Sequence, residues 1–96
     1  MSGYETINGQ PAKVYSEVAL ERVRQESKWG EQNHHPMVWL SILGEEVGES
    51  CEAANEAYHS GPSQGKWENY RKELIQVAAV AIAMVESLDR ELKNGK

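Results

Sequence analysis

The sequence predicts an all-α fold of antiparallel helices. Along three segments, apolar residues recur at spacings of three and four, as on one face of a helix. No segment shows the period-two alternation of a half-buried strand, and clusters of Gly and Pro separate the three segments. The 96 residues correspond to one domain with a thin core of its own. We therefore expect an irregular segment at 1–11 and one helical domain at 12–96.

The first helix is expected at about 12–28. Val14, Val18 and Ala19 share one face, which predicts that this side packs against the rest of the domain. Gly30 follows at the position where a residue in the left-handed conformation commonly ends a helix. The helix should therefore stop immediately before Gly30.

The second helix is expected at about 37–59. Pro36 suits its first turn, and Ser60-Gly61-Pro62 should end it. Residues at spacings of three and four predict one apolar stripe facing the core. Its members are Leu40, Leu43, Val47, Cys51, Ala54 and Tyr58.

The third helix is expected at about 66–93. Its centre, Leu74–Val85, is apolar on nearly every face, and such a helix must be buried on all sides. A lone three-helix domain of this size can hardly do that. We therefore expect a homo-oligomer, either a dimer or a tetramer, in which this helix packs against its copy. The alternative is a tight monomer in which the helix is simply central.

Charge and composition exclude several classes of partner. The net charge of −5 argues against a nucleic-acid binder and against an anionic membrane surface, but it permits a divalent metal ion. The single cysteine, Cys51, allows no internal disulfide, which fits a reducing cytoplasm. No signal peptide is apparent, and the apolar centre of the third helix is too short to span a bilayer.

Residues 44–56 contain five glutamates and no lysine or arginine. On a helix, Glu45, Glu49, Glu52 and Glu56 fall within a narrow arc, and Glu46 lies about a quarter-turn away. Each like-charge neighbour pair costs roughly 0.2–0.5 kcal/mol on an exposed helix. A solubilising acidic face is the plain interpretation, but such faces usually carry basic partners.

Two further features suggest that the acidic face meets another helix. Gly44 and Gly48 weaken the helix unless a second helix must approach closely. In the third helix, Glu73 and Gln76 share a face, and Gln76 is the one polar residue within the apolar run. Glutamates from two facing helices would form a cage of hard oxygen ligands, which suits Mg²⁺ or Mn²⁺.

The pattern Glu45-Glu46-x-x-Glu49, followed by Glu73 at the start of an apolar helix, resembles the MazG-like all-α nucleotide pyrophosphohydrolases. Their signature is EExxE and then ExxD. The stretches ERVRQESKWGEQNHH, WLSILGEEVGE and KELIQVAAVAIAMVESL are similar to a short branch of this family found in phages, and the resemblance covers about residues 20–89. One departure is that Gln76 stands where the family has its final Asp, so metal binding should depend more on the glutamates.

The resemblance implies a MazG-like helical bundle that hydrolyses a nucleoside triphosphate to its monophosphate and pyrophosphate. It also implies two or three Mg²⁺ or Mn²⁺ ions as cofactors. The implied metal ligands are Glu46, Glu49, Glu73 and Gln76, and the implied catalytic residues are Glu45, Glu46 and Glu49. Within this branch, the short chain and its KWGEQNH element are similar to the MazG-like enzymes of phages that replace adenine with 2-aminoadenine. These enzymes convert dGTP to dGMP, so the resemblance makes dGTP a candidate substrate.

The base, sugar and phosphates need further contacts, for which residues near the acidic helix are candidates. They are Lys28, Trp29, Gln32, His35, Trp39 and Lys72. An indole ring can stack on a base, and a lysine can pair with a phosphate. The ordinary interpretation is that Trp39 belongs to the core, that His34 lies at the surface and that most lysines are solvated.

Two other functions remain open from the sequence. Glu56-x-x-His59 and Glu31-x-x-His34 have the spacing of a carboxylate-bridged di-iron bundle, although one lies at a helix end and the other in a loop. The second alternative is a non-enzymatic helical module whose acidic face meets a basic partner. Glu86 and Asp89 also have the ExxD spacing, but they lie about 20 Å beyond Glu73 along a straight helix. The two positions cannot belong to one site, so we assign Glu73 to it and expect Glu86 and Asp89 to be solvent-exposed.

Overall fold

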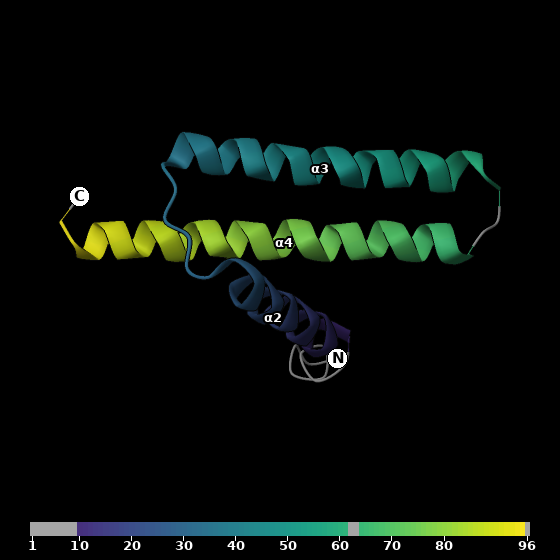
Figure 1. Cartoon of the computed structure of the whole chain (residues 1–96). Coiled ribbons are helices and arrows are strands. Elements are labelled where there is room, and N and C mark those ends of the chain that lie inside the picture. The colour runs from purple at the N-terminus through teal and green to yellow at the C-terminus, as the bar shows by residue number, and fades with distance from the viewer. Residues whose placement is uncertain (1–9, 62–63, 96) are drawn as a thin grey trace.

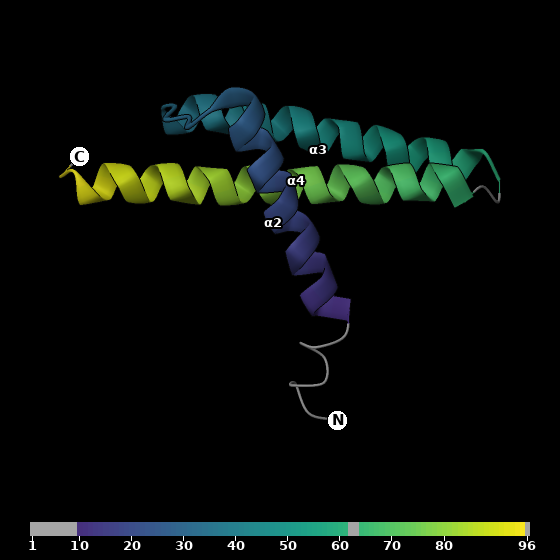
Figure 2. The same cartoon turned by 60° about the horizontal axis from the view of Figure 1, so that its bottom comes forward.

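The computed structural model describes residues 10–61 and 64–95, and these form three helices. They are α2 (Gln10–Trp29), α3 (Pro36–His59) and α4 (Gln64–Lys93). Helices α3 and α4 lie side by side as an antiparallel hairpin, and α2 crosses α4 on one side of it (Figures 1 and 2). No strand occurs within the described ranges, so the all-α prediction is confirmed.

The helix ends follow from local backbone chemistry. Gly30 adopts a φ of 74°, and its N–H donates to the carbonyl of Glu26 at 2.8 Å, which confirms it as the residue that ends α2. Helix α3 begins at Pro36, as predicted. It ends where Ser60 donates its N–H to the Glu56 carbonyl and Gly61 takes a φ of 77°.

The start of α2 differs from the prediction. Residues 1–9 of the expected irregular segment 1–11 lie outside the described residues, but Gln10 and Pro11 are already helical. A proline is tolerated in the first turn because the N–H that it lacks has no partner there in any case. The irregular segment therefore ends earlier than the Gly- and Pro-rich composition suggested.

The contact face of α3 is not the predicted apolar stripe. The predicted stripe includes Leu40, Val47 and Tyr58, which are exposed, with Leu40 at 51%. The buried residues lie about a quarter-turn away and are mostly small: Trp39, Ser50, Ala53 and Ala57. The prediction was wrong because small side chains let α4 approach closely, whereas the larger apolar residues remain on the adjoining outward face.

The apolar core forms where the start of α3 meets the centre of α4. Trp39, Val80 and Ala83 are buried together. Three half-buried residues pack against them: Ile42, Leu43 and Met84. From α2, Val18 is buried as predicted, but Ala19 is exposed, so the contact face of this helix is narrower than expected.

Ion pairs hold α2 against α4. Arg71 donates two hydrogen bonds to Glu17, at 2.7 and 2.6 Å, and Arg22 pairs with Glu86. Near the end of α4, the guanidinium of Arg90 donates to the side chain of Asn33, in the connection after α2, at 2.8 Å. Exposed ion pairs contribute little stability individually. Their positions along α4 nevertheless fix where α2 crosses the hairpin.

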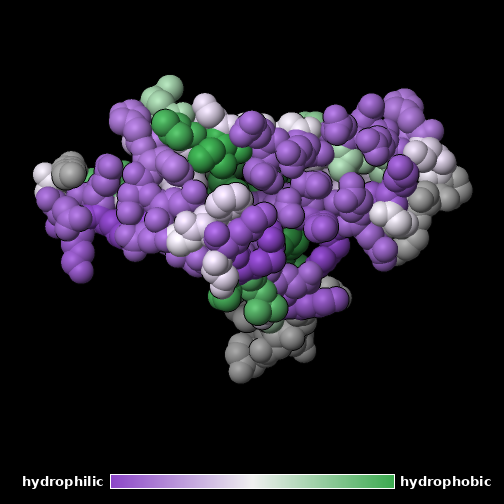
Figure 3. Space-filling view, viewed as in Figure 1, coloured by the Kyte–Doolittle hydropathy of each residue, from purple (hydrophilic) through white to green (hydrophobic). Residues whose placement is uncertain are grey.

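An apolar surface remains uncovered on the hairpin. Leu74 and Val85, at the two ends of the central apolar run, are exposed by 42% and 58%. A groove of about 280 Å³ runs between α3 and α4, and no residue of α2 lines it. By contrast, the face shown in Figure 3 is mainly hydrophilic over α4. The single chain therefore leaves the third helix incompletely buried. Within the described ranges, no helix is long and apolar enough to cross a membrane.

The close α3–α4 contact leads to a stability prediction. Ala57 is 1% exposed, so Ala57→Leu should force the helices apart and lower the free energy of unfolding by roughly 1–3 kcal/mol. Urea unfolding followed by circular dichroism at fixed protein concentration measures this. Ala19→Leu, on the exposed side of α2, is the matched control and should change stability by less than about 0.5 kcal/mol. Equal effects of the two variants would contradict the described packing.

Candidate metal centre

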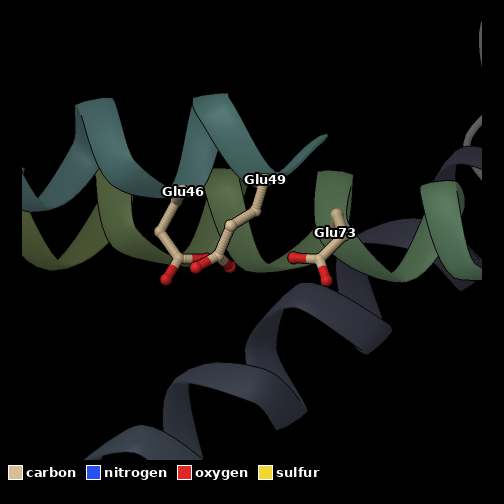
Figure 4. Close-up of side chains that lie close together, drawn as sticks. All are labelled: Glu46, Glu49 and Glu73. Atoms are coloured by element: carbon tan, nitrogen blue, oxygen red, sulfur yellow. The ribbon is translucent and has the colours of Figure 1, made fainter. Parts of the chain in front are cut away.

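Three carboxylates from two helices converge on one point. Glu46 and Glu49 lie one turn apart on α3, and Glu73 lies on α4. One carboxylate oxygen from each residue lies within 4.8 Å of the other two. In Figure 4 the three side chains extend to the same side of the hairpin, toward α2. Among the described residues, this is the one group of three or more His, Cys, Asp or Glu side chains with such spacing.

No ion pair with a cation of the described residues neutralises the carboxylates of this group. Glu46 and Glu73 are half-buried, and one oxygen of each, Oε2 of Glu46 and Oε1 of Glu73, is buried without a hydrogen-bond partner in the described structure. Burial raises the pKa of Glu46 above its ordinary value, and the negative charges of Glu49 and Glu73 raise it further. Buried acceptors without donors, placed beside other carboxylates, fit a divalent cation with a preference for oxygen ligands.

The glycines do not have the role predicted for them. A Cβ atom built at Gly44 or Gly48 would meet nothing within 4 Å, so no second helix of this chain approaches either residue. The prediction that Gly44 and Gly48 allow close contact with a second helix was therefore wrong for the single chain. The small residues on the buried face of α3 provide the close approach instead.

A recess of about 380 Å³ adjoins Glu46 and is walled by all three helices. Five residues predicted for the site line it together: Lys28, Trp29, Gln32, Trp39 and Gln76. This volume is adequate for a nucleobase and its sugar. The structure thus places most of the predicted substrate contacts beside one member of the acidic group.

The two tryptophans of the recess differ in their surroundings. Trp39 is 4% exposed and belongs to the core, as the ordinary interpretation expected. It packs edge-on against His34, with ring centroids 4.9 Å apart, so the expectation that His34 lies at the surface was wrong. Trp29 is 62% exposed, and the ammonium of Lys28 lies 4.8 Å from the centroid of its ring. Trp29 is therefore the ring with a free face for stacking.

Three residues of α2 line this recess that the sequence analysis did not propose: Glu21, Arg24 and Gln25. The carboxylate of Glu21 accepts hydrogen bonds from Arg24, at 3.0 and 2.5 Å, and its charge also contributes to the raised pKa of Glu46. The spacing of these residues in the sequence could have indicated that they belong to the site. These residues precede Lys28 by seven, four and three positions, which places them on the helix face already assigned to the site.

Two of the predicted contacts lie elsewhere. His35 does not line the recess, and its Nδ1 accepts a hydrogen bond from the N–H of Met37 at 3.0 Å, which caps the start of α3. Lys72 lines a separate recess between α2 and α4.

The other glutamates of α3 do not join the group of three. Glu45 is exposed, and so is Glu52. Glu56, near the end of the helix, pairs with Lys66 at 3.6 Å. Glu45 stays close enough to Glu46 for its charge to raise the pKa of that carboxyl.

The residue pairs proposed for a di-iron site do not converge in the described structure. Glu31 and His34 lie in the connection between α2 and α3, where Glu31 approaches Arg90 at 3.5 Å. His59 packs edge-on against Tyr58 at the far end of α3. Neither pair belongs to the group of three carboxylates.

Comparisons with protein-family models, with curated proteins and with solved structures give no match for this chain. The interpretation of the site therefore depends on its residues and their geometry.

The acidic group leads to a prediction about pH. Because folding raises the pKa of Glu46, this carboxyl keeps its proton to a higher pH in the folded chain than in the unfolded chain, where its ordinary value is 4.5. The contribution of this group to stability is therefore lost as pH rises through the folded pKa. Glu46→Gln should become more stable relative to wild type as pH rises from 4 to 8, as measured by urea unfolding without divalent ions. A constant difference across this range would contradict the electrostatic description.

Proposed function

We propose that this protein is a metal-dependent nucleoside triphosphate pyrophosphohydrolase of the MazG-like type. The observation that carries the proposal is the convergence of Glu46, Glu49 and Glu73, two of which bury carboxylate oxygens that have no hydrogen-bond partner. An adjoining recess of nucleoside size supplies the second requirement of such an enzyme.

In this proposal, Glu46, Glu49 and Glu73 hold Mg²⁺ or Mn²⁺, and Gln76, which lines the same recess as Glu46, is a candidate for a further oxygen ligand. Divalent ions bound there supply charge neutralisation for the phosphates and lower the pKa of water. Glu45 lies exposed beside the group and is the candidate to accept a proton from the attacking water. The products are a nucleoside monophosphate and pyrophosphate.

The recess lined by Lys28, Trp29 and Gln32 is the proposed position of the base and sugar. The exposed ring of Trp29 can stack on a base, and the amide of Gln32 can both donate a hydrogen bond to the base edge and accept one from it. A glutamine amide can pair with the edge of any base, so dGTP is the first substrate to test because of the resemblance to the phage enzymes.

The test of this function is a panel of dNTPs and NTPs with Mg²⁺ or Mn²⁺, in which pyrophosphate and orthophosphate release are measured separately. We expect pyrophosphate release by wild type, and a loss of at least about a hundredfold in Glu49→Gln and Glu73→Gln, because each removes a charged ligand. Glu56→Gln is the matched control on the same helix and should retain activity. If wild type hydrolyses no nucleotide, the proposal is wrong, and release of orthophosphate would overturn the reaction type.

We also propose that the uncovered apolar surface of the hairpin forms a homo-oligomer. On α4, outward residues alternate at spacings of four and three, which is typical of a helix–helix seam. They are Leu74, Ala78, Ala81, Val85, Leu88 and Leu92. The exposed residues Leu40 and Val47 of α3 lie seven positions apart, and so on one face of that helix, and they add to this apolar surface. Two hairpins joined through it would form a four-helix bundle.

The seam predicts the effect of a charge placed within it. Val85→Glu should shift the molar mass from that of an oligomer to that of the monomer, as measured by size-exclusion chromatography with light scattering. Val23→Glu, at an exposed position of α2, is the matched control and should leave the mass unchanged. A monomeric wild type would contradict the oligomer without affecting the argument for the metal centre.

A further inference from the structure

A second recess, of about 640 Å³, lies between α2 and the first half of α4. Four cationic side chains line it, in a chain whose net charge is −5: Lys13, Arg24, Arg71 and Lys72. Of these, Lys72 was among the predicted site residues. Positive charge is therefore concentrated in this recess, although the chain as a whole is acidic.

The carboxylates around this recess do not neutralise all of its cations. Glu17 holds Arg71, and Glu21 holds Arg24, each through two hydrogen bonds. A third carboxylate, Glu68, also lines the recess and has an interaction of its own. Four cations thus face three carboxylates.

The two lysines of the recess are the cations open to a ligand. Among the described residues, no hydrogen bond or ion pair is found for Lys13 or Lys72, although the charge of Lys13 acts on Glu17 and that of Lys72 acts on Glu21. Both side chains are exposed, so an anion that enters the recess would meet two ammonium groups that are not hydrogen-bonded to a carboxylate.

The basic recess adjoins the nucleoside recess. Glu21 and Arg24 line both of them, so they form a shared wall. Lys72 immediately precedes the acidic-group residue Glu73, and the charges of Lys72 and Glu46 both act on Glu21. A molecule whose base occupies the nucleoside recess and whose α-phosphate lies at the metal centre would thus extend its remaining phosphates toward the basic recess.

We propose that the basic recess binds the terminal phosphates of the nucleoside triphosphate and the pyrophosphate released from it. This inference rests on the proposed function and specifies the orientation in which the substrate binds. The nucleoside lies toward Trp29, the α-phosphate at the acidic group, and the β- and γ-phosphates toward Lys13 and Lys72. Ammonium groups suit this position because they form charge-assisted hydrogen bonds with phosphate oxygens.

Lys13 is the residue that tests this inference most cleanly. Arg71 and Arg24 also hold α2 or Glu21, so their loss would alter the fold around the site. Lys72 is adjacent to Glu73, and its replacement would disturb the metal centre. Lys13 lies on α2, lines the basic recess and is exposed, and its charge acts on Glu17 without a hydrogen bond between the two side chains in the described structure.

The experiment measures binding of inorganic pyrophosphate in the presence of Mg²⁺ by isothermal titration calorimetry. Lys13→Gln should weaken this binding roughly threefold to tenfold, as expected for one exposed charge contact with phosphate, and Lys13→Glu should weaken it more. Binding of dGMP, which has no β- or γ-phosphate, should be the same in wild type and both variants. Lys93→Gln, at the far end of α4, is the matched control and should bind pyrophosphate as wild type does.

Unchanged pyrophosphate binding in Lys13→Glu would overturn the inference, and so would an equal loss of dGMP and pyrophosphate binding. Failure of the proposed function gives a different result. If wild type hydrolyses no nucleotide but Lys13→Gln still weakens pyrophosphate binding, the basic recess is a phosphate site and the hydrolase proposal fails. If wild type hydrolyses nucleotides but the Lys13 variants bind pyrophosphate as wild type does, the hydrolase proposal is retained and the proposed position of the terminal phosphates is wrong.

Discussion

The close packing of α3 against α4 is the constraint on which the rest of the structure depends. The buried positions along this hairpin are occupied mainly by Ala and Ser: Ser50, Ala53 and Ala57 on α3, and Ala79, Ala83 and Ser87 on α4. The side chains between two packed helices determine the distance between the helix axes, so small residues allow a short distance. This short separation allows carboxylates from the two helices to approach within 4.8 Å. Larger core residues would separate the helices and the acidic group with them.

Bringing three carboxylates together creates electrostatic repulsion, and no cation among the described residues forms an ion pair that would relieve it. On α2, Arg24 is held by Glu21 and Arg22 by Glu26 and Glu86, so the arginines nearest the site are engaged with other carboxylates. Lys28 lies against Trp29. A binding protein that used a simple acidic surface would have no reason to bury oxygens of Glu46 and Glu73 without donors. This arrangement is more consistent with a site whose missing charge is supplied by a ligand.

The sequence predicted those features that depend on local chemistry. Gly30, Pro36 and Gly61 mark helix ends because their backbone preferences act within a few residues. The convergence of Glu46 and Glu49 with Glu73 was predictable as well, because a hairpin of two antiparallel helices joined by a short loop brings these positions to a similar level. The buried face of α3 was not predictable from its periodicity, because two adjoining faces are both apolar or small. The roles of Glu21 and Arg24 depend on where α2 crosses, and ion pairs between residues 54 and 64 positions apart determine that.

The segment 44–56 illustrates how one helix serves three purposes at once. Ser50 and Ala53 face α4 and are buried, so their small size sets the helix spacing. Glu45, Glu49 and Glu52 lie on one side of that buried face, and Glu49 belongs to the acidic group there. Val47, Cys51 and Ala54 lie on its other side, on the apolar surface that the single chain leaves uncovered. Because these two sides flank the buried face in opposite directions, a second copy could cover the apolar surface without closing the acidic one. The proposed association and the proposed metal binding therefore do not compete for α3, and the absence of lysine from this segment is consistent with both.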